Sequence, residues 1–167
     1  MSKVVPGRFS AEIDESFVVF VIGMRVNNIW AVNKWLPTVR AMSPMLNTLH
    51  QYPDKGFLGQ ESFFRLSPLC TIMMTYWKSF EHLEYFARNA DDPHLEPWRI
   101  FNKSIGSDGS VGIWHETYLI GAGQSESIYV NMPVFGLAAA TRHVPSVGKK
   151  ETARRRLGGN NLSAIPN

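Results

Sequence analysis

The segment Val111–Ile120, with the sequence VGIWHETYLI, combines a tryptophan, a histidine, a glutamate and a tyrosine within an otherwise apolar stretch. A buried strand carries titratable groups only where they have partners or a function. Side chains two residues apart share one face of a strand. One face would carry Ile113, His115, Thr117 and Leu119, and the other Trp114, Glu116 and Tyr118.

His115 is the residue of this strand best suited to acid–base chemistry, because an imidazole exchanges protons near neutral pH. We interpret it as a general base, or as a hydrogen-bonding group, that lines a pocket between the sheet and its helices. The alternative is a buried histidine whose ring is satisfied by a neighbouring strand or helix.

A second candidate centre lies where the first predicted strand ends. Arg25 closes that strand, and Asn27 and Asn28 follow as candidate caps of the next helix. A cation beside the backbone donors of a helix N-terminus can hold a carboxylate or an enolate. We therefore predict that Arg25 and Asn28 hold an anion that His115 generates. The alternative is an ordinary strand-end charge followed by a simple cap.

Aromatic and acidic side chains complete the predicted site. Glu116 has an alternative role, since Arg25 or Arg65 is a suitable partner for an ion pair across an interface. Tyr76 likewise has an alternative role as a core residue. The predicted substrate-contacting residues are Trp114, Glu116, Tyr118, Tyr76 and Trp30.

The elements that position these residues follow from hydrophobic periodicity. Residues 16–26 are apolar on both faces, which is typical of a central strand. Apolar positions spaced by three and four predict a helix that starts at Asn27 or Asn28 and is kinked or broken at Pro37 and Pro44. Further strands are expected at 57–66, 69–77, 111–120 and 127–130, and further helices from Ser79 and over 94–105.

This order predicts an α+β domain over residues 1–147 with the ferredoxin-like βαββαβ topology, in which helices cover one face of an antiparallel sheet. Because the strand at residues 16–26 is apolar on both faces, the other face also needs cover. A homodimer joined through its sheets would supply that cover.

The remaining residues, 148–167, are basic and poor in apolar residues, so we expect a flexible tail without a nucleic-acid partner. Cys70 is the single cysteine, which excludes an intramolecular disulfide and suits a reducing cytoplasm. No signal peptide is visible, and no apolar run approaches the roughly 20 residues of a membrane helix. The sequence contains no GxGxxG, P-loop, CxxC or HExxH motif, which argues against the common nucleotide and zinc chemistries.

Several blocks of the chain resemble a known family. The blocks are GRFSAEID, FVVFVIGMRVNNIWAVNKWLP, YWKSFEHLEYFAR, GSVGIWHETYL and NMPVFGLAAA, within residues 7–140. They are similar to the DUF4188 or fumagillin-pathway-type monooxygenase-like proteins, which belong to the dimeric α/β-barrel superfamily together with the antibiotic-biosynthesis monooxygenases.

The resemblance implies a homodimeric, cytoplasmic monooxygenase-like enzyme of secondary metabolism that acts on a small apolar molecule without metal or flavin. The same superfamily also includes haem-degrading monooxygenases and aldoxime dehydratases, which use a histidine as axial ligand. A haem enzyme with His94 or His115 as ligand is therefore one alternative. A dimer that binds a small ligand without catalysis is the other.

Overall fold

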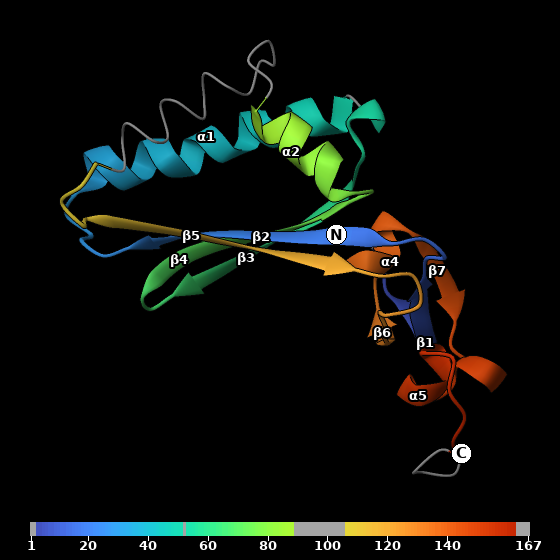
Figure 1. Ribbon diagram of the computed structural model, residues 1–167. Helices are drawn as coiled ribbons and strands as arrows, with labels where there is room; N and C mark the ends of the chain where they lie inside the picture. Colours follow the sequence, from blue (N-terminus) through green and yellow to red (C-terminus); the bar gives the residue numbers. More distant parts are fainter. Residues whose placement is uncertain (1–2, 52, 89–105, 163–167) are drawn as a thin grey trace.

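The computed structural model describes residues 3–51, 53–88 and 106–162, with the side chains of residues 41–48, 51 and 53 outside that description. The helix predicted over residues 94–105 and the candidate haem ligand His94 lie outside the described residues. The described chain forms two sheets and the helices that pack on them (Figure 1).

The larger sheet contains β2 (Phe17–Val26), β3 (Phe57–Leu66), β4 (Leu69–Trp77) and β5 (Val111–Ile120), in the order β3-β4-β2-β5. Every neighbouring pair in this sheet is antiparallel. The predicted ferredoxin-like topology is therefore confirmed. Three of these strands have the predicted bounds, and β2 begins one residue later than predicted.

In the described part of the chain, helical elements follow β2 and β4 of the larger sheet. α1 (Val32–Gln51) connects β2 to β3, the short 3-10 helix η1 (Pro53–Lys55) precedes β3, and α2 (Phe80–Arg88) follows β4. Figure 1 shows α1 and α2 on the same face of the sheet. We call this the helix face, and the opposite one the outer face.

The core between the helices and the sheet has two clusters of buried residues. One contains Val18, Leu49, Phe57, Trp77, Leu83 and Phe86. The other contains Met24, Val26 and Val111, with Trp35, Val39, Leu69 and Ile113 packed against it. Burying one large apolar side chain stabilises a fold by about 1.5–3 kcal/mol, so these clusters hold both helices on the sheet.

α1 differs from the helix predicted for this stretch. It runs over Val32–Gln51 without a break, through both Pro37 and Pro44. Each proline removes one backbone hydrogen bond from the helix. Trp35 and Val39 pack against the sheet, and the helix has 20 residues. Packing against the sheet therefore outweighs the two missing bonds. Of the predicted kink or break, the break into two helices is wrong, and the kink stays a prediction.

The smaller sheet contains β1 (Val5–Glu12), β6 (Tyr129–Met132) and β7 (Arg142–Pro145), in the order β6-β1-β7. The strand predicted at residues 127–130 overlaps β6, whereas β1 and β7 were not predicted. In β1, apolar and polar residues alternate poorly, because the strand contains Pro6, Gly7 and Arg8. Pairing between segments distant in the chain makes β1 and β7 strands.

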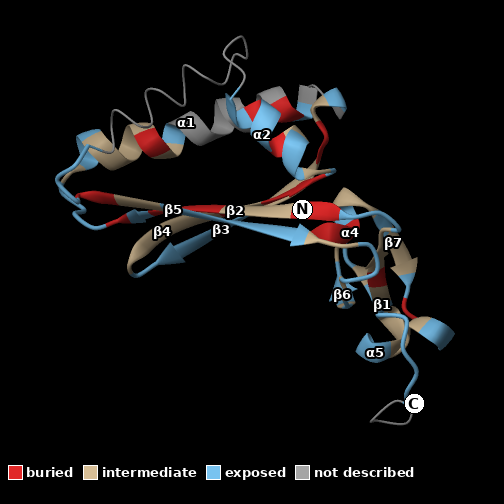
Figure 2. Cartoon of the chain, in the orientation of Figure 1, coloured by how far each residue is buried: buried red, intermediate tan, exposed pale blue. Residues whose placement is uncertain are grey.

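A short helix, α4 (Leu137–Ala140), joins the smaller sheet to the outer face of the larger one. Leu137 packs with Phe17 and Tyr76 in a third buried cluster. The chain itself therefore covers one end of the outer face. Figure 2 shows the buried residues of β2 beside α4, where the two sheets meet.

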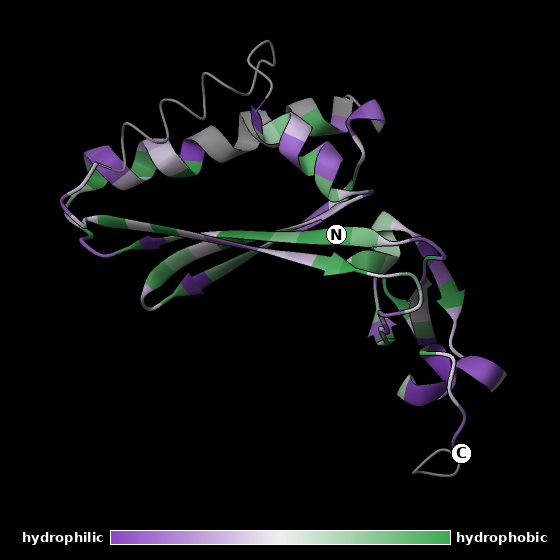
Figure 3. Cartoon of the chain, viewed as in Figure 1, coloured by the Kyte–Doolittle hydropathy of each residue, from purple (hydrophilic) through white to green (hydrophobic). Residues whose placement is uncertain are grey.

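The described C-terminal residues 148–162 form a 3-10 helix, η2 (Gly148–Lys150), and a helical turn, α5 (Ala153–Arg156). Figure 3 shows that these elements are hydrophilic. This differs from the free tail predicted from the lack of apolar residues, because ion pairs and backbone contacts hold the segment against β1. Its mobility in solution stays a prediction. Among the described residues, no helix is long and apolar enough to cross a membrane.

Candidate functional site

The two faces of β5 have the composition that their alternation predicted. Register with β2 pairs His115 with Ile22 and Thr117 with Phe20, and both of those β2 residues lie on the helix face. Trp114, Glu116 and Tyr118 therefore lie on the outer face. Because β5 is an edge strand, most of its residues are exposed (Figure 2).

His115 lies on the helix face in an exposed position. Its ring centroid is 5.6 Å from that of Phe20, with the two rings tilted by 40°. Within the described part of the chain, no residue forms a hydrogen bond with the imidazole. The structure therefore favours an accessible histidine over the alternative of a buried and satisfied one, and both ring nitrogens can reach a ligand that lies on this face.

Two cavities flank His115 along β2 and β5. One, of about 10 Å³, lies between α1 and the sheet and is large enough for about one water molecule. The other, of about 270 Å³, opens at the far end of the strands beside Val18, Leu119 and Phe80. Ile113 lines the first cavity and Leu119 the second, whereas His115 and Thr117 lie between them and are exposed. We call the helix-face surface of Ile113, His115, Thr117 and Leu119 the β5 surface.

The polar residues of the small cavity were missed in the sequence. Thr38 of α1 and Thr71 of β4 both line it. Thr38 is only 1% exposed, and its hydroxyl donates to the carbonyl oxygen of Lys34 at 2.9 Å. A polar residue within the apolar stripe of a helix was the available signal. The other residues that line this small cavity are apolar, so it is largely apolar, like the one at the other end of the β5 surface.

Arg25 and Asn28 do not lie with His115. Arg25 pairs with Gly112 of β5, three residues from His115 and on the outer face. The backbone nitrogen of Asn28 donates to the carbonyl oxygen of Ser110 at 3.0 Å, and its side-chain oxygen accepts from the backbone nitrogen of Trp30 at 3.0 Å. These residues form a turn, and α1 begins only at Val32.

The predicted anion site at a helix N-terminus is therefore wrong in its geometry. The Ser110 carbonyl takes the backbone donors of Asn27 and Asn28, which would otherwise face a ligand. One protomer does not bring Arg25 and His115 together, because they lie on opposite faces of the sheet. Trp30 is 88% exposed beside this turn. The functional roles of Arg25, Asn28 and Trp30 stay predictions.

Trp114 lies across β2 on the outer face. A Cβ atom at Gly23 would come within 2.4 Å of the indole nitrogen, so the missing side chain of Gly23 makes room for Trp114. Next along β5, the hydroxyl of Tyr118 donates to the carboxylate of Glu116, and this hydrogen bond raises the pKa of Tyr118. Glu116 therefore pairs with Tyr118 within the described protomer, instead of with Arg25 or Arg65.

Tyr76 lies on the outer face beneath α4 and is 5% exposed. Burial raises the pKa of Tyr76 to about 12, and the nearby Tyr129 and Glu61 add to the shift. The phenol is therefore protonated at neutral pH. Glu61 accepts a hydrogen bond from the backbone nitrogen of Gly136 at 2.7 Å, which ties β3 to α4. This geometry favours the core role of Tyr76 over substrate contact.

The absence of a metal, which the sequence resemblance implied, stays a prediction for the whole chain, since the positions of candidate metal ligands are known for the described residues only. They contain no group of three histidine, cysteine, aspartate or glutamate side chains that could hold a metal ion. His82 lies in the first turn of α2, with its Nδ1 atom 2.9 Å from the Ser79 hydroxyl oxygen. Ser79 also accepts from the backbone nitrogen of His82 at 3.4 Å, as expected for a helix cap.

Solved structures with a similar fold include two enzymes. The structure of aldoxime dehydratase OxdRE in complex with butyraldoxime matches with a TM-score of 0.61 and 14% identity, over 80% of this chain and 39% of that chain. The cofactor-independent oxygenase SnoaB from Streptomyces nogalater matches with a TM-score of 0.45 and 10% identity, over 62% of this chain and 91% of that chain.

Sequence comparison goes further than the fold. Monooxygenase af470 from Aspergillus fumigatus is 28% identical over 149 residues, which cover 78% of this chain and 53% of that protein. The chain thus spans about half the length of this curated relative. Residues 17–137, more than half of the chain, match the family described as monooxygenase af470-like. The predicted resemblance is confirmed, and the chain belongs to the monooxygenase af470-like family.

Proposed function

We propose that the protein is a monooxygenase-like oxidoreductase that acts on a small apolar organic molecule without metal or flavin. The observation that carries this proposal is the position of His115, an accessible imidazole on the β5 surface between two largely apolar cavities. Family membership supports oxygenase chemistry, and His115 on the β5 surface is the proposed base.

A substrate with an acidic C–H or O–H group would lie over Phe20 and Thr117, with its acidic proton near the ring of His115. The imidazole takes that proton and leaves an electron-rich anion. The anion gives two electrons to dioxygen, a carbon–oxygen bond forms, and the resulting peroxide takes the proton back. Loss of water from the peroxide converts the CH2 group and O2 into a carbonyl group and H2O, so the substrate itself supplies the electrons.

Apolar walls favour this chemistry. The lining of the 270 Å³ cavity at one end of the β5 surface includes the apolar side chains of Val18, Phe80 and Leu119, which can pack against an aromatic ring. The cavity volume is close to the lower end of the range for small-molecule sites, roughly 300–1,000 Å³. We therefore expect a compact phenolic or enolisable substrate.

The test is oxygen uptake by the full chain in the presence of a chelator, with a panel of polycyclic phenols and enolisable aromatic ketones. We expect His115→Ala to lower kcat by about 10²–10⁴-fold, the usual contribution of a general base. His50→Ala, which changes an exposed histidine on α1, is the matched control. Full turnover by a folded His115→Ala protein would exclude His115 as the base.

Arg25 and Asn28 enter the proposal through a separate variant. Arg25 lies on the outer face and not on the β5 surface. The variant Arg25→Ala therefore separates an anion-holding role from a role in an interface. A loss of turnover in a variant that keeps its oligomeric state would support the first role. Unchanged turnover would remove Arg25 and its neighbour Asn28 from the mechanism.

We also propose a homodimer joined through the outer face. Phe63, Trp114 and Tyr118 are 41%, 38% and 48% exposed there, which is unusual for large aromatic side chains on one sheet face. A second copy would cover them by the same surface. Light scattering tests this: Trp114→Asp should convert dimers to monomers, whereas a wild-type protein of 18.9 kDa in solution would contradict the proposal.

Two alternatives predicted from the sequence are distinguished by the same experiments. The cavity of about 10 Å³ near His115 is far too small for a porphyrin, so we derive no step through haem. Absorption near 400 nm after hemin addition, lost in His115→Ala, would revive the haem alternative. Tight binding of a panel compound without oxygen uptake would favour the non-catalytic ligand-binding dimer.

The proposed setting is a reducing cytoplasm and a pathway of secondary metabolism. Cys70 is a free cysteine, which suits a reducing compartment. Fractionation of the producing cells with an antibody against the chain would test the location.

A further inference from the structure

A second cavity, of about 420 Å³, lies by the smaller sheet, away from α1 and α2 (Figure 1). Its walls are β1, the loop at residues 123–127 and the C-terminal segment at residues 149–158. Its volume falls within the range for small-molecule sites, roughly 300–1,000 Å³. None of its lining residues belongs to the β5 surface.

The C-terminal segment brings cations to this cavity. The lining contains the cations Lys149, Lys150, Arg155 and Arg156 and the acids Glu12, Asp14 and Glu126. All three acids are already neutralised: Glu12 pairs with Lys150 and Arg142, Asp14 pairs with Arg142, and Glu126 pairs with Arg156. The cations that remain can therefore act on a ligand.

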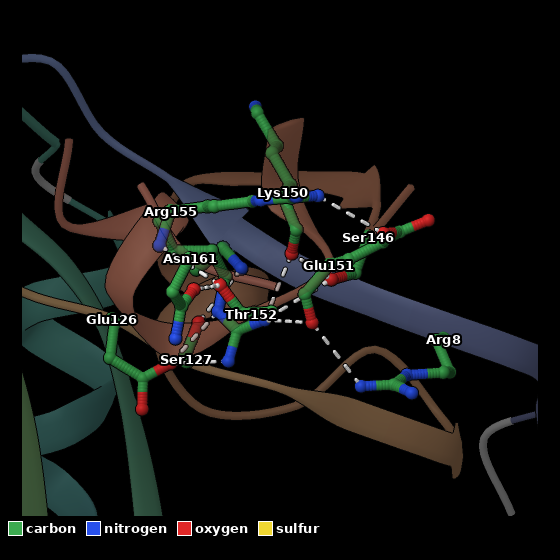
Figure 4. A network of polar contacts seen from close by, with 11 residues as sticks. Arg8, Glu126, Ser127, Ser146, Lys150, Glu151, Thr152, Arg155 and Asn161 are labelled. Carbon is green, nitrogen blue, oxygen red and sulfur yellow. Dashed lines mark hydrogen bonds and ion pairs between the residues drawn. The ribbon is translucent and has the colours of Figure 1, made fainter. Parts of the chain in front are cut away.

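Two of these cations have N–H donors that no described residue accepts from. Lys149 is exposed and forms no ion pair within the described part of the chain. Arg155 uses one nitrogen, Nη1, for both its contacts, which are the carboxylate of Glu151 at 3.2 Å and the carbonyl oxygen of Gly148 at 3.1 Å (Figure 4). Its Nε and Nη2 atoms have no partner among the described residues.

A buried hydroxyl lies in the same wall. Ser10 of β1 is 1% exposed and lines the cavity. Its Oγ atom has no hydrogen-bond partner among the described residues, although buried hydroxyl groups in folded proteins are normally satisfied. Neighbouring Ser127 is satisfied, since its Oγ accepts from the backbone nitrogen of Ala11 at 2.9 Å. The unmet donor of Ser10 thus calls for a ligand acceptor.

We propose that this cavity binds the phosphate group of a small molecule. Phosphate oxygens accept hydrogen bonds from guanidinium, ammonium and hydroxyl groups together, which are the donors that Arg155, Lys149 and Ser10 offer. The volume exceeds that of the phosphate group itself, so the cavity also has room for an organic part. The cations converge on one cavity instead of forming a stripe, which favours a small anion over a nucleic acid.

The experiment titrates inorganic phosphate, and then glycerol phosphate, into the full chain at constant ionic strength, with chloride as the reference anion. Calorimetry and the melting temperature report binding. We expect saturable stabilisation by both phosphates and not by chloride. Lys149→Gln and Arg155→Gln should each weaken binding about tenfold, the effect of one charge-assisted hydrogen bond.

Ser10→Ala separates a ligand-binding role from a structural one. Removal of an unsatisfied hydroxyl should leave the melting temperature without phosphate unchanged or higher, while phosphate binding weakens several-fold. Arg88→Gln is the matched control for Arg155→Gln, because Arg88 also pairs with a glutamate four residues earlier, at 3.0 Å. Lys3→Gln serves the same purpose for Lys149.

Three outcomes would overturn the proposal. Phosphate and chloride could stabilise the chain equally, or Lys149→Gln and Ser10→Ala could bind phosphate as the wild type does. The third outcome is tight binding of a short DNA duplex without binding of either phosphate.

Discussion

The two sheets of this protein are stabilised by different forces. The larger sheet packs apolar side chains of β2, β4 and β5 against α1 and α2, and its Trp77 is 2% exposed. The smaller sheet has the C-terminal segment held to β1 and to the loop before β6 by charged groups (Figure 4). Apolar burial leaves a periodic pattern in the sequence, whereas ion pairs between distant residues leave none.

The best example of the second kind is Arg156. Its side chain is 8% exposed, and its Nε and Nη2 atoms lie 2.8 and 2.6 Å from the Glu126 carboxylate. Its Nη1 atom also donates to the backbone carbonyls of Lys150 and Glu151. Arg156 of α5 thus joins the loop before β6 to the end of η2. A count of apolar residues cannot reveal this contact.

The largest effect should come from Trp77→Ala. The indole packs on Phe57 and Phe86 and donates to the hydroxyl of Thr75 at 2.9 Å. Loss of a buried tryptophan costs about 3–5 kcal/mol, so urea denaturation should show a large loss in the free energy of unfolding. Tyr85→Ala, at a position 64% exposed on α2, should change it by less than about 1 kcal/mol.

Truncation after Val147 should have the next largest effect. It removes Lys150, one of the two cations paired with Glu12, and Arg156, the partner of Glu126. It also uncovers Ser10 and Ser146, which are 1% and 3% exposed. We expect the melting temperature to fall by roughly 5 °C or more, since each kcal/mol corresponds to about 2–4 °C in a chain of this size. An unchanged melting temperature would show that the segment is free in solution, as its composition predicted.

Arg156→Gln should have a smaller effect, of about 1–3 kcal/mol, because Glu126 keeps partial access to water while it loses its partner. Arg154→Gln, at an exposed neighbouring position, is the control and should be close to neutral. A double-mutant cycle with Glu126→Gln measures the coupling. Additive effects of the two changes would mean that the ion pair does not hold the segment.

The smallest effects should depend on pH. Hydrogen bonds from Lys150, and then from Arg142, lower the pKa of Glu12, and Lys34 lowers the pKa of Asp108 to about 2. A depressed pKa stabilises the fold above the unfolded value of about 4 and loses that contribution as the pH falls through the folded value. The destabilisation by Glu12→Gln and by Asp108→Asn should therefore shrink between pH 5 and pH 2. A constant difference in melting temperature would contradict this assignment.

The sequence was sufficient where burial is local and periodic. Strands at residues 57–66, 69–77 and 111–120 were predicted with the bounds they have, and His115 was assigned to the helix face. Alternation with a period of two settles such a face once one neighbouring strand is known. The family was also identified from blocks of sequence within residues 7–140, and the match over residues 17–137 confirms it.

The sequence was insufficient where a residue's partner is far away in the chain. Arg25 and Asn28 looked like an anion site because a helix was expected to start beside them, but the carbonyl of Ser110 accepts from the backbone nitrogens of Asn27 and Asn28. Ser110 lies more than 80 residues later, and no local pattern records that contact. The break expected at Pro37 is absent for the same reason, since packing on the sheet outweighs local propensity.

The sequence by itself therefore determined the ferredoxin-like sheet, its helix face and the family. Only the tertiary structure decided that His115 and Arg25 lie on opposite faces, that β1 pairs with β6 and β7, and that the basic segment packs on β1. The physical reason is that hydrophobic burial acts through the periodicity of each element. Hydrogen bonds and ion pairs act through single contacts between residues that only the folded chain brings together.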